Sequence, residues 1–589
     1  MANFIALVDG DTERRGRFLR RVLAEIMPVE SLRIDSVEVG DFAAVWAASD
    51  RAPISSTCSD TSAAIIWGDA IPGPGSERLD APGLLRAWEP RPKALPGPFD
   101  GFHAALRYDG VQGLTLGADL LGLFPVYYAQ RAGVLLIGSS PELFRHHPFF
   151  PARLNGEGLA GILLTHAPFE GRALLAGVRR LRPGFLLRWH RESEPVEAEQ
   201  YAMPAAASIE SGSFREDVDR LDATLAMAID RHVPRNGTAG VLLSGGRDSR
   251  LLAGYLRERG HPLHALTLGA PTDYEVIGAT AVARALGCTH RVMALEEQQF
   301  PPGAELQAKW EHLGSGFASI HMWGAIAPLR DLPSRCLSGY LREIREVEPM
   351  PTAFAELLVG VRHRGIAPAT LHRLMRRDAF DGMIAGLERR LQVVYEQGCS
   401  VEAQRPWRFL LAHDWRSHAG GVPWKLSFGS WPVLPILDRA VLELLSALPD
   451  SSLADRRAQD EILRRRFPDL ARLPLDRNSD DTLPLLPSVG QRILHRVRRG
   501  VEPIRRRIPR KVERRYYHRV YDVNGPGWRA VRQLAERHRE RLASLFDMNV
   551  LSELVPGPDT RIDIEHPIQG SFGTKMLIGL MLWSGDHLS

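Results

Sequence analysis

The chain has few cysteines and no long hydrophobic run, and each shortage excludes a class of protein. Its four cysteines, Cys58, Cys288, Cys336 and Cys399, form no CxxC pair, which argues against a zinc knuckle and a disulfide framework. No stretch approaches the roughly 20 apolar residues of a membrane span. The chain opens apolar and then turns charged (MANFIALVDGDTERRGRFLRR), the reverse of a signal peptide. We therefore expect a cytoplasmic protein without a membrane partner.

Lysine is scarce as well, because only five of the 74 basic residues are lysines. They are Lys93, Lys309, Lys425, Lys511 and Lys575. Any lysine with a chemical role must be one of these five.

Length and composition point to a multidomain globular protein. At about 100–200 residues per domain, 589 residues predict two or three domains. The apolar fraction of 44% and the charged fraction of 24% exclude wholesale disorder. The net charge of +4 is uneven, since residues 491–519 hold twelve Lys/Arg against two Glu. We favour a solvated helical face for this run, and the alternative is a surface for nucleic acid or another polyanion.

The first 200 residues contain short apolar or alternating runs bounded by Gly, Asp or Pro, which predict a largely antiparallel sheet domain with a few helices. The small and polar stretch 202–213 is typical of a linker. After it, strand-like and helical patterns alternate, which predicts a parallel α/β sheet, and from about 350 onward the pattern is mostly helical. The strand-like runs of the first part are 63–69, 101–110, 113–122, 124–129, 133–140 and 184–190.

The hexamer Ser244-Gly245-Gly246-Arg247-Asp248-Ser249 lies between the apolar run VLL and an amphipathic helix. Two glycines allow a sharp turn that points backbone N–H groups into one concavity, and the following helix adds the positive end of its dipole. Such a loop suits pyrophosphate, and Asp248 is placed to ligate Mg²⁺. There is no GxxxxGK[ST], so this is not a Walker loop. The alternative, a plain tight turn, is disfavoured by the strand-to-helix setting.

SGGRDS resembles the pyrophosphatase loop of the ATP-pyrophosphatase (PP-loop) enzymes, and its surroundings resemble the asparagine synthetase branch of that family. Further segments that resemble this branch follow one another in the family's order over roughly residues 100–450. In the fourth of these segments, Glu275 stands where the family has an acidic residue. They are ADLLGLFPVYY (118–128), GSSPELF (138–144), RLRPGFLLRW (180–189), TLGAPTDYEVIGATAVARALGCTH (267–290) and PVLPILDRAVLELLSALP (432–449).

This resemblance implies an α+β, Ntn-hydrolase-like glutaminase-type sandwich, followed by an α/β PP-loop synthetase domain with a parallel sheet and a helical C-terminal part. It also implies ATP and Mg²⁺ as cofactors. The domains that we expect are 1–203 (degenerate glutamine amidotransferase-like), 204–213 (linker), 214–490 (PP-loop synthetase-like) and 491–589 (basic helical C-terminal extension). The residues implied to bind ATP and pyrophosphate are Leu243, Ser244, Gly245, Gly246, Arg247, Asp248, Ser249, Thr267, Leu268 and Gly339.

Glutamine-dependent members of the branch begin, after removal of Met, with a cysteine nucleophile, whereas residue 2 here is Ala2. We therefore expect an inactive N-terminal domain, retained as a structural partner of the synthetase. The attacking nitrogen is then expected to be an amine of the substrate.

The second magnesium motif of the family is replaced by residues 337–343 (LSGYLRE), which resemble the corresponding place in β-lactam synthetases. By that resemblance Tyr340 is the general base and Glu343 the second Mg²⁺ ligand, beside Asp248. Alternatively, Tyr340 is a pocket wall. The family lysine that steadies the transition state has no counterpart in LPLDRNSDDTLP (473–484), so either Arg477 or Lys425 supplies that charge.

Together these features resemble lasso-peptide macrolactam synthetases (lasso cyclases) most. The implied reaction adenylates a side-chain carboxylate of a ribosomally made core peptide and joins it to the peptide's N-terminal amine, releasing AMP and pyrophosphate. A leader-binding protein and a leader peptidase are further candidate partners. The alternatives are a β-lactam-type ring-closing ligase, an ammonia-dependent asparagine synthetase-like enzyme, and a PP-loop RNA-modifying enzyme. His321 and Trp323 are candidates for the acceptor pocket, with core packing favoured.

Overall fold

The structure is a computed structural model in which most of the chain is described. The residues outside the description are 1, 74–76, 90–94, 192, 203–211, 235, 295, 340–364, 381, 398–400, 419, 476–482, 506–512, 565–570 and 589. Most of the predicted linker therefore lies outside the described residues.

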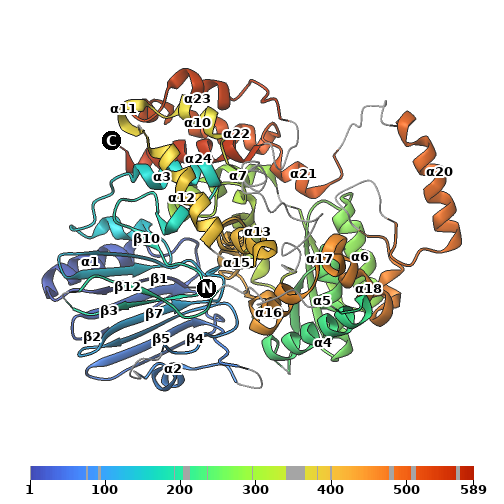
Figure 1. Cartoon of the computed structure of the whole chain (residues 1–589), viewed down its shortest axis with the longest axis horizontal. Helices are drawn as coiled ribbons and strands as arrows, with labels where there is room; N and C mark the ends of the chain where they lie inside the picture. The colour runs from blue at the N-terminus through green and yellow to red at the C-terminus, as the bar shows by residue number, and fades with distance from the viewer. Residues whose placement is uncertain are drawn as a thin grey trace.

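The N-terminal part is a sandwich of two antiparallel six-stranded sheets with the strand orders β10-β8-β9-β1-β3-β2 and β12-β11-β7-β6-β5-β4 (Figure 1). The sheets pack through large aromatic side chains: Phe4 of β1 stacks on Trp67 of β5 with ring centroids 4.0 Å apart. The strands are β1 (Ala2–Val8), β2 (Arg33–Val39), β3 (Phe42–Ala48), β4 (Ile54–Cys58), β5 (Ser62–Gly68), β6 (His103–Asp109), β7 (Gly113–Ala118), β8 (Tyr127–Arg131), β9 (Val134–Gly138), β10 (Arg179–Arg180), β11 (Phe185–Trp189) and β12 (Val196–Glu199). The helices here are α1 (Thr12–Glu25), α2 (Ala81–Ala87), η1 (Glu142–His146), α3 (Gly156–Thr165) and η2 (Phe169–Gly171).

Each of the six strand-like runs contains a strand, but two boundaries differ from the prediction. Strand β7 ends at Ala118 and β8 begins at Tyr127, whereas the sequence extends these runs to 122 and back to 124. The buried Asp119 carboxylate accepts the backbone N–H groups of Leu121, Leu123 and Phe124. Because these N–H groups bond to a side chain, the segment between the strands forms a tight turn instead of a sheet ladder.

The second part is built on a parallel five-stranded sheet with the order β15-β14-β13-β16-β17. This confirms the expected parallel α/β sheet. The order runs outward from β13 to β15, then returns to the other side of β13 with β16, so a topological switch point lies between β13 and β16. The strands are β13 (Ala239–Leu242), β14 (Leu263–Leu268), β15 (Thr289–Met293), β16 (Arg335–Leu337) and β17 (Trp431–Val433). The helices α4 (Phe214–His232), α5 (Arg247–Glu258) and α6 (Tyr274–Leu286) accompany it.

The sandwich and the parallel sheet meet at a charged and aromatic interface. Arg335 donates two hydrogen bonds to Asp69, at 2.9 and 2.8 Å. Arg439 bonds to Asp100 at 3.0 Å. A Cβ atom on Gly68 would lie 2.5 Å from the Trp431 ring, so the two parts are packed without a gap at this point.

Helices make up most of the remaining chain and cover the sandwich and the sheet in Figure 1. They are η3 (Glu297–Gln299), α7 (Phe300–Glu311), η4 (Ile320–Ala325), α8 (Ile326–Leu329), α10 (Pro368–Leu374), α11 (Arg377–Phe380), α12 (Met383–Gln397), η5 (Glu402–Gln404), α13 (Arg405–Phe409), η6 (Leu410–Trp415), α14 (Arg416–His418), α15 (Gly421–Leu426), η7 (Pro435–Leu437), α16 (Arg439–Ala447), α17 (Asp450–Leu453), η8 (Ala454–Arg456), α18 (Arg457–Arg466) and α19 (Pro468–Ala471).

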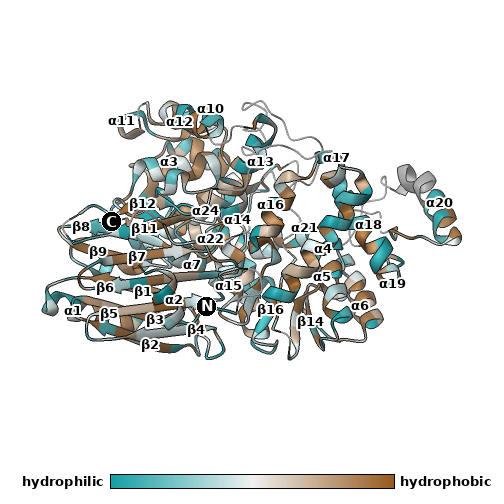
Figure 2. Ribbon diagram, turned by 60° about the horizontal axis from the view of Figure 1, so that its bottom comes forward, coloured by the Kyte–Doolittle hydropathy of each residue, from teal (hydrophilic) through white to brown (hydrophobic). Residues whose placement is uncertain are grey.

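The predicted extension 491–589 is helical, and it divides into two unlike parts. Helix α20 (Val489–Arg505) stands away from the body in Figures 1 and 2. The helices after it join the body, and α24 (Phe572–His587) is apolar almost all round because it is buried there (Figure 2). The others are α21 (Tyr516–Tyr521), α22 (Pro526–Glu536), η9 (Arg539–Leu542) and α23 (Met548–Leu554). Among the described residues, no helix is both long enough and apolar enough to cross a bilayer.

Candidate active site

The SGGRDS hexamer forms the turn from β13 into α5. Gly246 is the N-cap of α5 and carries no side-chain cap. Gly245 has φ +73°, and a Cβ atom there would lie 2.6 Å from the backbone nitrogen of Ala279 in α6. Only glycine fits this backbone and this close approach. The amino end of α5, with its positive dipole, therefore opens onto the carboxyl edge of the sheet.

The serines of the hexamer brace the turn from inside. Ser249 Oγ accepts the backbone N–H of Ser244 at 3.2 Å and lies 3.1 Å from Ser244 Oγ. The backbone N–H of Gly246 donates to Ser244 Oγ at 3.3 Å. Ser249 is buried, with 4% of its surface exposed. The loop thus holds its shape through its own side chains, which is the preorganisation that a phosphate-binding turn needs.

Residues at the ends of the neighbouring strands lie at the same carboxyl edge of the sheet. A Cβ atom on Gly339, two residues after β16, would lie 3.0 Å from Ser249 N and 3.1 Å from Asp248 Cβ. The Thr267 hydroxyl, near the end of β14, donates to Leu243 O at 2.6 Å. The structure therefore gathers Leu243–Ser249, Thr267, Leu268 and Gly339 at the carboxyl ends of β13, β14 and β16, which is where open α/β sheets bind ligands.

Asp248 lies in the first turn of α5 with only 8% of its surface exposed. A carboxylate oxygen is the donor class that Mg²⁺ prefers, so Asp248 fits the predicted metal role. Glu343, the second predicted ligand, and the candidate catalytic residues Tyr340 and Arg477 lie outside the described residues. Their roles stay predictions.

Lys425 of α15 is fully buried, with 0% of its surface exposed. Its Nζ donates to Glu311 Oε1 and Ser319 Oγ, both at 2.8 Å, and these residues belong to α7 and to the segment before η4. Burial lowers the pKa of Lys425, although the Glu311 charge acts in the opposite direction. The structure places this lysine in a buried ion pair, and its catalytic role also stays a prediction.

The sequence analysis did not identify Arg250, whose buried side chain anchors the Ser244–Ser249 loop. Its guanidinium is fully buried and donates to Gly245 O and Pro474 O at 2.7 Å each, and also to Leu470 O at 2.7 Å. Arg250 thereby ties the hexamer to the chain that leads to Arg477. An arginine four residues after the SGG turn is the signal available in the sequence, but only the fold shows what it holds.

Arg247, by contrast, points away from the loop: its guanidinium pairs with Asp460 of α18. The pair fastens α5 to the helical part. The predicted role of Arg247 in pyrophosphate binding would then depend on its backbone N–H group.

The C-terminal helices reach the same edge of the sheet. Arg519 of α21 donates to both carboxylate oxygens of Asp273, at 2.8 and 2.7 Å. The backbone N–H of Tyr516 donates to Glu275 Oε2 at 3.1 Å. Helix α21 of the predicted extension therefore bonds to two acids at the start of α6, through the Arg519 side chain and the Tyr516 backbone.

His321 and Trp323 pack in the core, as favoured from the sequence. His321 is 4% exposed and lies against the rings of Tyr516 and Tyr521. Trp323 is 5% exposed and contacts Trp424.

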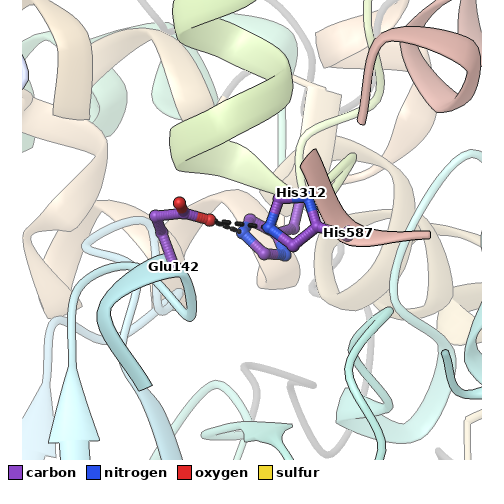
Figure 3. A group of neighbouring side chains, drawn as sticks. All are labelled: Glu142, His312 and His587. Carbon is purple, nitrogen blue, oxygen red and sulfur yellow. Dashed lines mark hydrogen bonds and ion pairs between the residues drawn. The ribbon is translucent and has the colours of Figure 1, made fainter. Parts of the chain in front are cut away.

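Glu142, His312 and His587 form a buried cluster between the sandwich, the end of α7 and the end of α24 (Figure 3). Glu142 Oε2 lies 2.9 Å from the Nε2 atom of each histidine. The Trp583 indole N–H donates to His312 Nδ1 at 3.0 Å, so the proton of neutral His312 sits on Nε2 and faces Glu142. His587 Nδ1 lies 2.8 Å from Trp583 O, an acceptor. The proton on His312 Nε2 leaves that atom no lone pair for a metal ion, so the three side chains form a hydrogen-bonded cluster.

Replacing His587 with alanine should destabilise the protein by about 3–5 kcal/mol, the usual cost of breaking a buried charged pair. Burial alone would raise the pKa of Glu142, but the hydrogen bonds from His312 and His587 lower it below its usual range, so the ionised carboxylate depends on both donors. Thermal or urea unfolding measures the effect. The exposed neighbour Asp586 supplies the control, D586A, with unfolding close to wild type. Equal stability of the two variants, or a melting temperature lowered by EDTA, would contradict this assignment.

Comparison with known proteins gives a family for the segment that carries the loop. Residues 220–319 match the family model for asparagine synthase. Curated proteins named "Putative asparagine synthetase (glutamine-hydrolyzing)", from Mycobacterium bovis and Mycobacterium tuberculosis, are 25% identical over 208 residues. That match spans 34% of this chain and only 32% of the length of each relative.

Two solved structures share parts of the chain at low similarity. NMN synthetase from Francisella tularensis aligns with 36% of this chain and 97% of its own, at 16% identity and a TM-score of 0.20. Glutamine phosphoribosylpyrophosphate amidotransferase from B. subtilis aligns with 50% of this chain and 91% of its own, at 9% identity and a TM-score of 0.23. The family match is limited to residues 220–319, the segment that carries the Ser244–Ser249 loop and is similar to asparagine synthase.

Proposed function

We propose that the protein is an ATP-dependent, AMP-forming ligase that closes a macrolactam in a ribosomally made peptide, as lasso cyclases do. The observation that carries the ligase assignment is the braced Ser244–Ser249 loop at the switch point between β13 and β16. A turn of backbone N–H groups at a helix start suits pyrophosphate held as a leaving group.

The proposed reaction has two steps. An oxygen of the peptide's Asp or Glu side chain attacks the α-phosphorus of ATP, and the bond to the bridging oxygen breaks, so that pyrophosphate leaves toward the loop. The N-terminal amine then attacks the acyl carbon, the carbon–oxygen bond to AMP breaks, and the amine loses a proton to a base. We assign that base to Tyr340 by resemblance. Mg²⁺ held by Asp248 and Glu343 would offset the charge on the phosphates.

We propose further that the N-terminal domain does not hydrolyse glutamine. Among the described residues, the sandwich contains one cysteine, Cys58, which is exposed on β4, whereas Cys288 and Cys336 belong to the synthetase part. Asp69 and Asp100 are engaged by Arg335 and Arg439 of the synthetase part. A domain packed in this way supports a structural role, which leaves an amine of the substrate as the nucleophile.

The proposal predicts AMP and pyrophosphate release from Mg-ATP with linear peptides that carry a free N-terminal glycine and an internal Asp or Glu. Mass spectrometry should find the product lighter by one water. The matched control is the same peptide with an acetylated N-terminus, which should give no ring because the nucleophile is blocked. A second control replaces the internal acid by its amide, which removes the group to be adenylated.

The other outcomes separate the alternatives. AMP release only with a small β-amino acid would replace the macrolactam by a β-lactam-type ring closure. AMP release only with ammonia and aspartate would favour an asparagine synthetase-like reaction. AMP release with none of these substrates would contradict the proposal in this form, and so would a product of unchanged mass.

A further inference from the structure

A pocket of about 420 Å³ lies between the N-terminal sandwich and the helices α12 to α14. One wall comes from residues 168–185 around η2, β10 and β11, and the other comes from residues 394–417. Its lining contains seven arginines but only two glutamates, Glu170 and Glu199. Guanidinium groups repel one another at close range, and an anionic occupant would offset that repulsion.

Two of these arginines, Arg180 and Arg416, are buried, with 3% and 6% of their surfaces exposed. Both donate to one backbone oxygen, Gly122 O, at 3.2 and 3.1 Å. Arg180 also donates to Gly314 O, and Arg416 to Leu181 O, both of which are backbone carbonyls. Burial and the neighbouring Arg180 lower the pKa of Arg416. The floor of the pocket is thus formed by two arginines, Arg180 and Arg416, whose hydrogen bonds go to backbone carbonyls.

The acids near the rim pair with arginines, two of which belong to the pocket lining. Arg172 pairs with Glu157 at 2.6 Å, and Arg182 pairs with Glu197. Glu170 is shared by Arg172 and Arg390, at 3.4 and 3.3 Å. In the part of the chain that the structure describes, Arg180 Nε is buried without a hydrogen-bond partner. Arg172 and Arg182 are thus paired with carboxylates, whereas the hydrogen bonds of Arg180 and Arg416 go to backbone carbonyls.

The remaining lining tells which kind of anion fits. Phe185, Tyr395 and Phe409 give the pocket aromatic walls, and among the described residues no asparagine or glutamine lines it to read a nucleotide base edge. Guanidinium groups on both walls suit several separate carboxylates better than one compact phosphate, and each fork can bind a carboxylate in a bidentate way. Aromatic walls suit apolar side chains between those carboxylates.

We propose that this pocket binds an acidic segment of the peptide substrate, with Arg180, Arg408 and Arg416 pairing with its side-chain carboxylates. The inference rests on the proposed function, and it adds a charge requirement for the substrate and a place for it. Arg180 also lines a small neighbouring cavity together with Glu311 and Trp424, so the pocket adjoins the buried Lys425–Glu311 pair. A peptide held here would be anchored at the junction of the two main parts of the chain.

Fluorescence anisotropy with the full chain and without ATP tests the pocket directly. The probe is fluorescein-labelled Gly-Glu-Glu-Phe-Glu-Gly, and its counterpart carries glutamine at each glutamate position. We expect the glutamate peptide to bind at least tenfold more tightly, and more weakly as NaCl rises from 50 to 200 mM. Arg408→Ala should weaken binding at least threefold, since Arg408 lines the pocket and is only half-buried. Arg33→Ala, an exposed arginine of β2 paired with Asp35, should bind like wild type.

Two results would overturn the pocket assignment: affinities of the two peptides within twofold, or equal binding by the Arg408→Ala and Arg33→Ala variants. Displacement by inorganic phosphate as efficient as by unlabelled peptide would assign the site to a small oxyanion and would also overturn it. The failure of this pocket assignment can be distinguished from the failure of the proposed function. Unselective binding with intact AMP release overturns the pocket alone, whereas selective binding with no AMP release from any peptide overturns the proposed function.

Discussion

Replacing Asp248 with asparagine is expected to lower AMP and pyrophosphate formation by at least about 10²-fold, the usual loss when one group that stabilises transition-state charge is removed. Asn keeps the size of the side chain but loses the charge that the phosphates and Mg²⁺ require. Asp248 lies in the first turn of α5, beside Gly339 and only 8% exposed. Continuous measurement of pyrophosphate release gives the rate.

The control variant removes the same negative charge at a position away from the Ser244–Ser249 loop. Asp469 is exposed and pairs with Arg472 three residues along the chain, so Asp469→Asn should retain wild-type activity. Both variants should melt within about 2 °C of wild type. Activity of Asp248→Asn within twofold of wild type would remove the magnesium assignment.

Lowering the pH from 7 to 5 is expected to destabilise the fold by about 6 kcal/mol in total. Burial lowers the pKa of His103, His312 and His413 to about 4 and that of His321 to about 3. The unfolded chain binds protons near pH 6.5, while these folded histidines stay neutral, so stability is complete above that pH and falls below it. Each histidine contributes a loss of about 2 kcal/mol at pH 5.

Asp119 acts in the opposite direction and reduces the total. Burial raises its pKa to about 6, despite the backbone N–H groups of Phe124, Leu123 and Leu121. The folded state therefore takes up a proton between pH 7 and 5 that the unfolded state does not, which returns about 1.4 kcal/mol. The sum of these effects is a net loss.

Urea unfolding at pH 7 and pH 5 measures this loss. His321→Phe removes one titrating group from an aromatic setting beside Phe300 and Tyr521, and should reduce the loss by about 2 kcal/mol. The exposed His190→Gln should leave the loss unchanged. A loss of the same size in His321→Phe and wild type would show that His321 is not neutral in the fold.

The features predicted well from the sequence are those made by neighbouring residues. The Ser244–Ser249 turn is formed by six consecutive residues whose glycines and serines act on their own backbone. The alternation of strands and helices from α4 to α6 follows from local hydrophobic periodicity. The sequence does not predict that β7 ends at Ala118 or that β8 begins at Tyr127. Hydrogen bonds to the Asp119 carboxylate, and not the apolar pattern, determine these limits.

Residue charge predicted part of the C-terminal arrangement. The basic run 491–519 favours a solvated helical face, and α20 stands apart from the body in Figure 1. Arg519, at the end of the run, pairs instead with Asp273. A charge count cannot tell which arginines find carboxylates elsewhere in the chain.

Local chemistry thus determines the Ser244–Ser249 turn and the alternation of strands and helices around it, because a turn, a helix start and a strand depend on residues close in sequence. The tertiary structure decided the rest: the approach of Gly339 to Asp248, the anchoring of the loop by Arg250, the Glu142–His312–His587 cluster and the arginine-lined pocket. These join residues up to 445 positions apart. Such contacts arise from how buried surfaces and charges are paired across the whole fold, which no single segment of sequence contains.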